Sequence, residues 1–363
     1  MKEKLAALAA MSNKYGADAN FVLAGGGNTS YKSADRLWVK GSGTALATIK
    51  PEDFVVLERE KLAKMWSAAY PQEENAREAA VLADMMAARV EGENRRPSVE
   101  TLLHDLFPQP YILHVHPAIV NGLTCSVEGE KAMKGLFPQA VWVEACKPGY
   151  ILALLCKEKM DAYKAETGKD CNLLFLQNHG IFFAGNTTEE LDEMANSVMT
   201  ALRNAVTYQP QLGKTAYDAE KVQQLASALA EAYAEKAEVA FTTCPEVLAY
   251  DPATKSLSPD HIVYAKAKQL CLEADADVKA AFAAFEKENG YKPKIVFVPG
   301  LGMFACGLSK NEAATALSVM MDAITVVAYT KSFGGVSPMP DFLIDFIVNW
   351  EVESYRSKVS LGK

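Results

Sequence analysis

The sequence lacks the cysteine pattern of a disulfide framework. The chain has seven cysteines, an odd number, and no two of them form a C-x-x-C pair. Small secreted domains depend on closely spaced, paired cysteines, whereas scattered thiols are typical of reducing compartments. We therefore expect a reduced, cytoplasmic protein whose cysteines are buried thiols.

Positive charge and long apolar runs are also missing. Lys and Arg number 37 against 45 Asp and Glu, a formal net charge of −8. A polyanion would be repelled, so this charge argues against non-specific nucleic-acid binding, although a local site can still bind a small anion. No uninterrupted run approaches the 18 or more apolar residues of a membrane-spanning helix, so we expect no membrane partner. The short apolar stretch at 5–11 favours an amphipathic first helix over a signal peptide.

What remains is a globular composition, half hydrophobic, in a chain of 39.4 kDa. This size predicts a large core and two domains. Apolar segments predict strands, and segments with high helical propensity predict helices between them. The expected strands are 37–40, 54–57, 111–115, 172–177 and 181–184; the expected helices are 5–16, 73–91, one that starts at Ser98, and one that starts near Thr187. This alternation predicts an α/β fold with a sheet between helical layers.

The sequence also contains an apparent internal repeat. Residues 178–185 align with 300–307, an offset of 300 − 178 = 122, and His179 is replaced there by Leu301. A weaker match aligns 50–55 with 258–263, at an offset of 258 − 50 = 208. We therefore expect a first domain at 1–207 and a second at 208–363, the second being a shortened, metal-free copy. The two offsets differ by 208 − 122 = 86 residues, so we expect the copy to lack most of the segment that carries Glu100, His114 and His116. The alternative is that strand–glycine–strand–helix units resemble one another by chance.

Only five histidines occur, and three of them have the spacing of a metal site. His114 and His116 lie two apart at the end of an apolar segment, and His179 follows in Asn178-His179-Gly180. Residues i and i+2 of a strand project from one face, so two imidazoles can reach one point. A third would complete an open, catalytic type of zinc site. The alternative is that these histidines are hydrogen-bonded core residues.

Glu100 and His104 precede the histidine pair on an expected helix that Ser98 caps. Glu100 lies 14 residues before His114, and a tight turn can bring a helix start back beside a strand end. A carboxylate there can be a metal ligand or a proton shuttle. A solvated glutamate stabilised by the helix dipole is the alternative. His104 shares a helical face with Glu100, and we expect it to orient Glu100 or a ligand through a hydrogen bond.

Two glycine-rich segments, 25–30 and 41–44, offer backbone N–H groups and hydroxyls. Such loops form anion-binding nests. Neither segment matches the G-x-x-x-x-G-K-[ST] or G-x-G-x-x-G pattern in its required context, so nucleotide binding is unsupported. Together with Ser98 they could bind one phosphate, and tight turns are the alternative explanation.

In this order and spacing, five segments resemble the class II aldolase/adducin family across residues 1 to about 205. They are Gly27-Asn28-Thr29-Ser30, Lys40-Gly41-Ser42-Gly43, Ser98-Val99-Glu100 with His104, His114-Val115-His116-Pro117 and Asn178-His179-Gly180. The remainder is similar to the continuation found in fused rhamnulose-1-phosphate aldolase/alcohol dehydrogenase proteins. The chain stops where their dehydrogenase domain would begin, so it resembles the aldolase part alone.

The resemblance implies a three-layer α/β/α sandwich, followed by the degenerate α/β repeat. It implies a zinc-type aldehyde-lyase, a homo-oligomer, that cleaves a ketose 1-phosphate to dihydroxyacetone phosphate and an aldehyde through a metal-stabilised enediolate. It implies that His114, His116 and His179 bind Zn²⁺, Mn²⁺ or Co²⁺, and that Glu100 is the acid/base. It also implies that the phosphate is contacted by Gly27, Asn28, Ser42, Gly43 and Ser98.

Two positions depart from the family pattern. Val99 replaces a second serine, and Trp142 stands where fuculose-phosphate aldolases have a proton-donating tyrosine, which leaves Tyr150 as a candidate donor. Related epimerases carry aspartate where Glu100 stands, which favours aldol cleavage. The alternatives are a metal-dependent epimerase, dehydratase or decarboxylase, and a non-enzymatic adducin-like interaction module.

Overall fold

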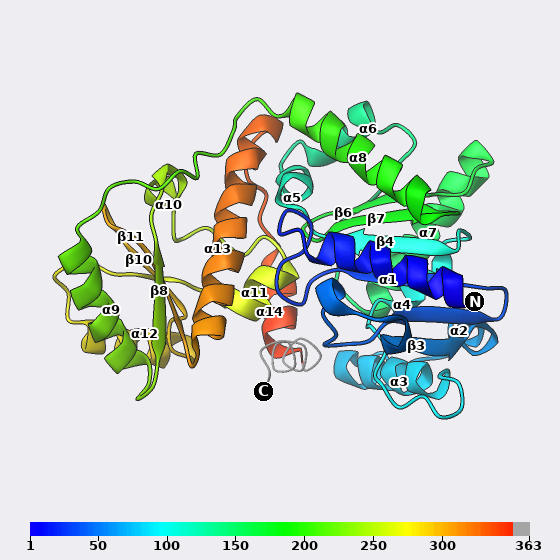
Figure 1. Cartoon of the computed structure of the whole chain (residues 1–363), viewed down its shortest axis with the longest axis horizontal. Coiled ribbons are helices and arrows are strands. Elements are labelled where there is room, and N and C mark those ends of the chain that lie inside the picture. The colour runs from blue at the N-terminus through cyan, green and yellow to red at the C-terminus, as the bar shows by residue number, and fades with distance from the viewer. Residues whose placement is uncertain (351–363) are drawn as a thin grey trace. The chain divides into compact units, whose positions relative to one another are not determined.

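The computed structural model describes residues 1–350, which form two compact units (Figure 1). Unit 1 comprises residues 1–124 and 130–204, and unit 2 comprises residues 125–129 and the chain from Ala205 onward. The predicted boundary after residue 207 lies three residues later than this one. The prediction also lacked segment 125–129, whose residues carry no compositional mark of belonging to unit 2.

Unit 1 is built on a seven-stranded sheet of order β3-β2-β1-β4-β7-β6-β5. All neighbours are antiparallel except β5 and β6, which are parallel. The strands are β1 (Asn28–Lys32), β2 (Arg36–Lys40), β3 (Phe54–Glu58), β4 (Tyr111–Val115), β5 (Val141–Val143), β6 (Leu173–Leu176) and β7 (Gly180–Gly185).

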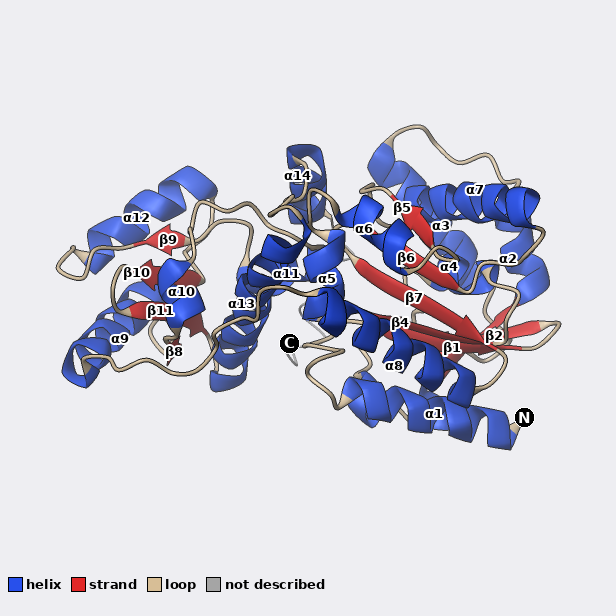
Figure 2. Cartoon of the chain, turned by 90° about the horizontal axis from the view of Figure 1, so that it is seen from above, coloured by secondary structure: helices blue, strands red, loops and turns tan. Residues whose placement is uncertain are grey.

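Helices cover both faces of this sheet, which gives the three-layer α/β/α sandwich that the sequence predicts (Figure 2). One face carries α1 (Lys2–Gly16) and α8 (Thr188–Ala205), which are joined by a hydrogen bond from Tyr15 to Asp192. The other carries α2 (Arg59–Met65), α3 (Glu74–Ala87), α4 (Thr101–Leu106) and α7 (Tyr150–Thr167), whose apolar side chains form one core with the strands. The remaining helices of unit 1 are α5 (Ala118–Thr124) and α6 (Gly129–Leu136).

Helix α4 begins later than the sequence predicts. Its N-cap is Glu100 and its first residue is Thr101, whereas Ser98 was expected to cap it. The Ser98 hydroxyl instead accepts a hydrogen bond from the Glu100 backbone N–H, 3.2 Å away. A serine that bonds a backbone group two residues on forms a local turn, and this turn delays the helix.

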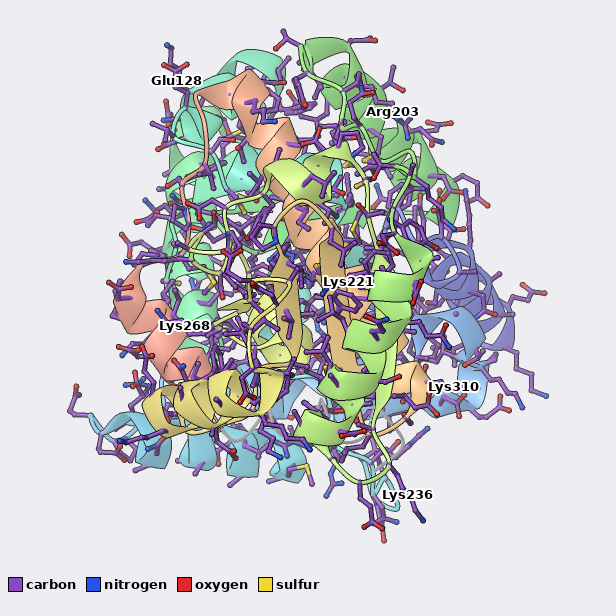
Figure 3. The ribbon with its side chains drawn as sticks, turned by 90° about the vertical axis from the view of Figure 1, so that its left-hand side faces the viewer. Glu128, Arg203, Lys221, Lys236, Lys268 and Lys310 are labelled. Carbon is purple, nitrogen blue, oxygen red and sulfur yellow. The ribbon has the colours of Figure 1, made fainter. Side chains whose placement is uncertain are left out.

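Unit 2 contains a four-stranded sheet of order β8-β11-β10-β9. Its strands are β8 (Glu238–Thr242), β9 (Leu270–Cys271), β10 (Ile295–Val298) and β11 (Gly302–Gly307). Its helices are α9 (Ala219–Tyr233), α10 (Pro245–Ala249), α11 (Pro259–Ala265), α12 (Val278–Asn289), α13 (Lys310–Thr330) and α14 (Asp341–Asn349). Figure 3 looks onto this unit, with Lys221 on α9 and Lys310 at the start of α13.

Unit 2 repeats part of unit 1. Strand β6, strand β7 and the first residue of α8 coincide with β10, β11 and the first residue of α13 at one constant offset, 295 − 173 = 122. The strand order β4-β7-β6-β5 has its counterpart in β8-β11-β10-β9, with the same parallel pair at the end. The turn residues Asn178 and Gly300 both have positive φ, 58° and 73°. Unit 2 is therefore the degenerate, shortened copy.

The start of the long helix is also repeated in detail. In unit 1 the Asn186 backbone N–H donates to the Glu190 carboxylate, 2.7 Å away. At the same offset, the Leu308 backbone N–H donates to the Glu312 carboxylate, 3.2 Å away. Chance similarity between two strand pairs does not produce the same capping bond at the same position.

The second sequence match is wrong. Residues 54–58 form strand β3, whereas 259–265 form helix α11. Both segments combine a proline turn with an apolar run, and short apolar runs do not distinguish strand from helix. The sheet register shows that the copy retains the strand that carries the histidine pair. His114 pairs with Phe182 in unit 1, and Phe241 pairs with the equivalent Phe304 in unit 2.

Within residues 1–350, one helical stretch, Lys310–Phe333, is long and apolar enough to cross a membrane by length and composition. Half of its most apolar window is buried, and α13 packs against β8, β11 and α11. A buried core helix meets the same criteria, so this is weak evidence for a membrane span. Asp322 divides this stretch, so no apolar run within it reaches 18 residues.

Lys32, the last residue of β1, is an unusual buried cation in unit 1. Its side chain is 4% exposed and its amine donates to the backbone carbonyl of His104 in α4. Burial lowers the pKa of Lys32 to about 7, although the charge of Asp105 opposes this. The pKa of Lys32 is lower in the folded than in the unfolded protein, so below about pH 7 the buried cation lowers the free energy of unfolding by its full amount. As the pH rises above that value, the folded protein loses this proton first and its free energy of unfolding increases.

We predict that the Lys32→Met variant removes this pH dependence. From about pH 7.5 to about pH 8.5, the free energy of unfolding of the unsubstituted protein should rise by about 1 kcal/mol relative to the variant. Urea unfolding at both pH values measures the difference. Lys64→Met, which removes an exposed lysine of α2, is the control and should show no such change. A parallel response of the protein and Lys32→Met would contradict the assignment.

Candidate metal centre

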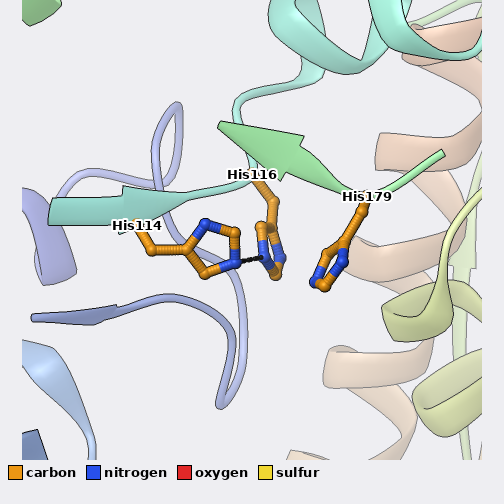
Figure 4. Close-up of side chains that lie close together, drawn as sticks. All are labelled: His114, His116 and His179. Carbon is orange, nitrogen blue, oxygen red and sulfur yellow. Dashed lines mark hydrogen bonds between the residues drawn. The ribbon is translucent and has the colours of Figure 1, made fainter. Parts of the chain in front are cut away.

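Three histidines converge at one end of the unit 1 sheet (Figure 4). His114 lies in β4, His116 just beyond it, and His179 in the turn between β6 and β7. Antiparallel pairing of Val115 with Ile181 brings that turn beside the end of β4. One ring nitrogen from each histidine lies within 4.8 Å of the others, and the two Nε2 atoms of His114 and His116 are 2.9 Å apart.

The backbone fixes which nitrogen of His114 faces the other rings. Its Nδ1 lies 2.9 Å from the carbonyl oxygen of Ile181, which can only accept, so Nδ1 carries the proton. Burial, as the largest effect, lowers the pKa of His114, so the ring is neutral and its unprotonated Nε2 accepts from His116 Nε2. A neutral imidazole whose other nitrogen donates to a carbonyl is the usual state of a metal-binding histidine.

Glu100 approaches the same point from the N-terminus of α4. Its Oε1 lies 3.3 Å from His114 Nε2 and 3.4 Å from His179 Nε2. This oxygen is buried and accepts no hydrogen bond within residues 1–350. Burial opposes ionisation of Glu100, but its interactions with the rings of His114, His179 and His116 keep its pKa well below the usual value. The side chain is therefore a carboxylate with one oxygen directed at the histidines.

These atoms fit a divalent cation. Zinc binds imidazole nitrogen at roughly 2.0–2.1 Å, so tetrahedral ligand atoms lie about 3.3 Å from one another. The spacings from His114 Nε2 to its neighbours, 2.9 and 3.3 Å, and the 3.4 Å from His179 to Glu100 are close to that value. A cation at their centre would also satisfy the buried Oε1 of Glu100.

Gly180 is a site residue whose role the sequence did not indicate. A Cβ at this position would lie 2.5 Å from the ring of His116 and 2.6 Å from the Val115 carbonyl. Only glycine allows the start of β7 to approach β4 this closely. The preceding Asn178 has a φ of 58°, and its backbone N–H donates to the carbonyl of Thr124, 3.1 Å away. The motif Asn178-His179-Gly180 was a sufficient signal, because each neighbour of His179 shapes the turn.

His104, which the sequence predicts to orient Glu100 or a ligand, does not contact the three histidines' shared point but bonds to Asn28, which in turn bonds to Glu100. The ring is fully buried, with Nδ1 2.7 Å from the Ser30 hydroxyl and Nε2 hydrogen-bonded to Asn28 Oδ1. Burial, as the largest effect, lowers the pKa of His104 well below its usual value. The His104 ring therefore reaches the Glu100 carboxylate through the side-chain amide of Asn28.

The predicted phosphate residues fall into two groups. Gly27, Asn28 and Ser98 lie beside Glu100: the Asn28 amide nitrogen is 3.3 Å from the Ser98 hydroxyl and also donates to Glu100 Oε2. Gly27 has a φ of 67°, and a Cβ there would lie 2.9 Å from the His114 carbonyl. Gly27 is thus required for the close approach of the loop to β4.

The second group is the loop at 41–43. Gly41 bridges Pro97, and the Ser42 backbone N–H donates to the Arg96 carbonyl at 2.9 Å. This places the loop beside the segment that leads to Ser98. Gly43 has a φ of 83°, so the loop needs glycine there. The neighbouring Lys40 is buried, which the sequence did not indicate.

Tyr150 does not serve as the missing proton donor. It is the first residue of α7 and is buried, with 7% exposure, and its hydroxyl donates to the Met65 carbonyl, 3.2 Å away. Burial raises its pKa above the usual value, which further opposes proton release. Sequence position alone suggested Tyr150, and the direction of its side chain could not be read from the sequence.

A model of the class II aldolase and adducin N-terminal domain matches residues 6–206, which contain all of these residues. The chain belongs to the class II aldolase/adducin family. It is 23% identical to the "uncharacterized oxidoreductase YuxG" of Bacillus subtilis (strain 168), across 95% of this chain and 57% of that protein. The chain thus spans little more than half the length of this relative.

Two solved structures are each similar to about half of the chain. The N-terminal class II aldolase domain of a conserved protein from Thermoplasma acidophilum is 25% identical, covers 55% of this chain and 91% of its own, and has a TM-score of 0.47. The L-fuculose-1-phosphate aldolase of Thermus thermophilus is 18% identical, covers 56% of this chain and 92% of its own, and has a TM-score of 0.36.

We predict that Gly180→Ala weakens metal binding by at least roughly tenfold, because the added Cβ displaces His116 from the other two imidazoles. Competition with a chromophoric chelator measures the affinity. Gly135→Ala is the control: this position in α6 has no atom within 4 Å of an added Cβ. Equal zinc affinities for Gly180→Ala and Gly135→Ala would show that the close approach at Gly180 is unimportant.

Proposed function

We propose that the chain is a zinc-dependent aldehyde-lyase that cleaves a ketose 1-phosphate to dihydroxyacetone phosphate and an aldehyde. The observation that carries the proposal is the buried Oε1 of Glu100, which faces Nε2 of His114 and of His179. Three imidazoles beside one carboxylate suit zinc, although Mn²⁺ and Co²⁺ accept the same ligands. The family resemblance supports a sugar phosphate as the substrate.

A divalent cation at the three imidazoles supplies positive charge opposite the negative charge that develops on the substrate oxygens during C–C cleavage. The protein supplies the remaining chemistry. His114, His116 and His179 hold the cation. Glu100 Oε1 accepts a proton from the substrate and returns it to the carbon released by cleavage. Glu100 Oε2 remains bonded to Asn28 during this transfer.

The phosphate end of the substrate is assigned to the loop at 41–43 and to Ser98. The Ser98 hydroxyl oxygen accepts from the Asn28 amide and from the Glu100 backbone, so its own proton can be donated to a phosphate oxygen. The buried cation of Lys40 precedes the loop and supports anion binding there. Anchoring the phosphate at this place would position the reacting carbons beside Glu100.

The length of the Bacillus subtilis relative and its name, an oxidoreductase, support the resemblance to rhamnulose-1-phosphate aldolase/alcohol dehydrogenase fusions. Rhamnulose 1-phosphate is therefore the first substrate to test. Retention of three histidines and Glu100 argues against an adducin-like interaction module, which needs none of them. Epimerase, dehydratase and decarboxylase activities give other products and are tested in the same assay.

We predict that the zinc-loaded protein releases dihydroxyacetone phosphate from at least one ketose 1-phosphate, and that removal of the metal by dialysis against a chelator abolishes the reaction. Coupling to glycerol-phosphate dehydrogenase detects the product, and the panel should include rhamnulose, fuculose and ribulose phosphates. Full cleavage by the metal-free protein would contradict the mechanism. Conversion of a sugar phosphate without a triose phosphate product would replace the aldolase by another enzyme of the family.

A second prediction separates metal binding from proton transfer. Glu100→Gln should retain about one zinc per chain, because the three histidines remain, but kcat should fall by roughly 100-fold or more. Metal analysis and steady-state kinetics of the same preparation measure both quantities. Glu78→Gln, which changes a carboxylate beside α7, is the control and should leave both quantities unchanged. A Glu100→Gln variant with unchanged kcat would exclude Glu100 as the proton shuttle.

A further inference from the structure

The side chain of Asn28 has no hydrogen-bond donor left for a substrate. Its amide nitrogen donates to Ser98 Oγ at 3.3 Å and to Glu100 Oε2, and its Oδ1 accepts from the ring of His104. An asparagine amide has two N–H donors, and both are used within the protein. The residue is also buried, with 5% exposure.

We propose that Asn28 and His104 are positioning residues that set the orientation of the Glu100 carboxylate. They do so through a one-way chain of hydrogen bonds that begins at Ser30. The chain runs from the Ser30 hydroxyl to His104, from His104 to Asn28, and from Asn28 to Glu100. This deepens the proposed function and rests on it, because it assigns Asn28 to Glu100 in place of the expected phosphate contact.

The direction of the chain follows from the contacts of Asn28. Its amide nitrogen, which can only donate, lies against Glu100 Oε2 and the Ser98 hydroxyl oxygen. The amide oxygen then faces His104 Nε2, which must carry the ring proton. His104 Nδ1 must therefore accept, and the Ser30 hydroxyl, 2.7 Å away, must donate. Each group in the chain has one arrangement that satisfies its neighbours.

Two rigid elements hold this chain. Asn28 and Ser30 are residues i and i+2 of β1 and therefore project from one face of the sheet. Glu100 is the N-cap of α4 and His104 lies four residues later, on the same helical face. Thr29 projects from the opposite face of β1, where its hydroxyl lies 2.7 Å from that of Ser12.

Holding Oε2 determines where the other oxygen of the carboxylate points. Glu100 Oε1 then faces Nε2 of His114 and of His179 and accepts no hydrogen bond within residues 1–350. Without the Asn28 amide, the carboxylate could rotate about its last side-chain bond and lose this alignment. A small misplacement of a proton-transfer group lowers the rate of the chemical step without weakening substrate binding.

The test compares Ser30→Ala with Thr29→Val, because each removes a buried hydroxyl from β1, on opposite faces of the strand. We expect Ser30→Ala and Asn28→Ala to lower kcat by roughly 10-fold to 100-fold, with unchanged KM and zinc content. Thr29→Val should leave kcat unchanged. Ser30→Thr, which keeps the hydroxyl, should have the kcat of the unsubstituted protein. A raised KM with unchanged kcat in Asn28→Ala would overturn the proposal and return Asn28 to phosphate binding.

A second measurement does not depend on catalysis. Nitrogen-15 NMR of the histidine-labelled, metal-free protein reports which ring nitrogen of His104 is protonated. We expect a neutral ring protonated at Nε2, and a changed signal in Ser30→Ala and Asn28→Ala but not in Thr29→Val. A ring protonated at Nδ1 would overturn the chain of hydrogen bonds even if the protein is active. If no sugar phosphate is cleaved but the Nε2 tautomer is found, the aldolase proposal fails and the positioning chain stands.

Discussion

The metal centre depends on the antiparallel register of β4 and β7. Pairing of Val115 with Ile181 places the turn that carries His179 beside the end of the strand that carries the other two histidines. The same pairing presents the Ile181 carbonyl to His114, which fixes Nε2 as the unprotonated ring nitrogen that faces the other histidines. A slip of one residue would move every side chain of β7 to the other face and remove both effects. Gly180 protects this register, because no larger residue fits against His116 and Val115.

Much of the site could be predicted because its chemistry is local in sequence. The spacing of His114 and His116 indicates a shared face of a strand, and Asn178-His179-Gly180 marks a tight turn. The proximity of Glu100 to His179 could not be derived from spacing, since it depends on how α4 and β7 each contact β4. The hydrogen bonds of the Asn28 amide could not be predicted either, because the partners of an asparagine side chain depend on which residues the fold brings beside it. Tyr150 illustrates the converse: its sequence position suited a proton donor, but its hydroxyl faces the core.

The two units show which features belong to the scaffold and which to the chemistry. Unit 2 retains the four-strand order, the positive φ at the turn and the carboxylate cap of the long helix. It has Leu301 where unit 1 has His179 and, by sheet register, Phe241 where unit 1 has His114. Two of the three histidines therefore have apolar counterparts in unit 2, although the strand order is shared. The sequence indicated this repeat at its best-matching turn, but a similar proline turn at Pro259 suggested the wrong extent.

The central claim is that three imidazoles and the Glu100 carboxylate surround one divalent cation. X-ray absorption spectroscopy at the zinc edge of the purified protein tests this most directly. We expect three nitrogen ligands at roughly 2.0–2.1 Å together with one or more oxygen ligands, and the loss of one nitrogen ligand in His179→Ala. Sulfur ligands at about 2.3 Å, or a spectrum unchanged by His179→Ala, would contradict it.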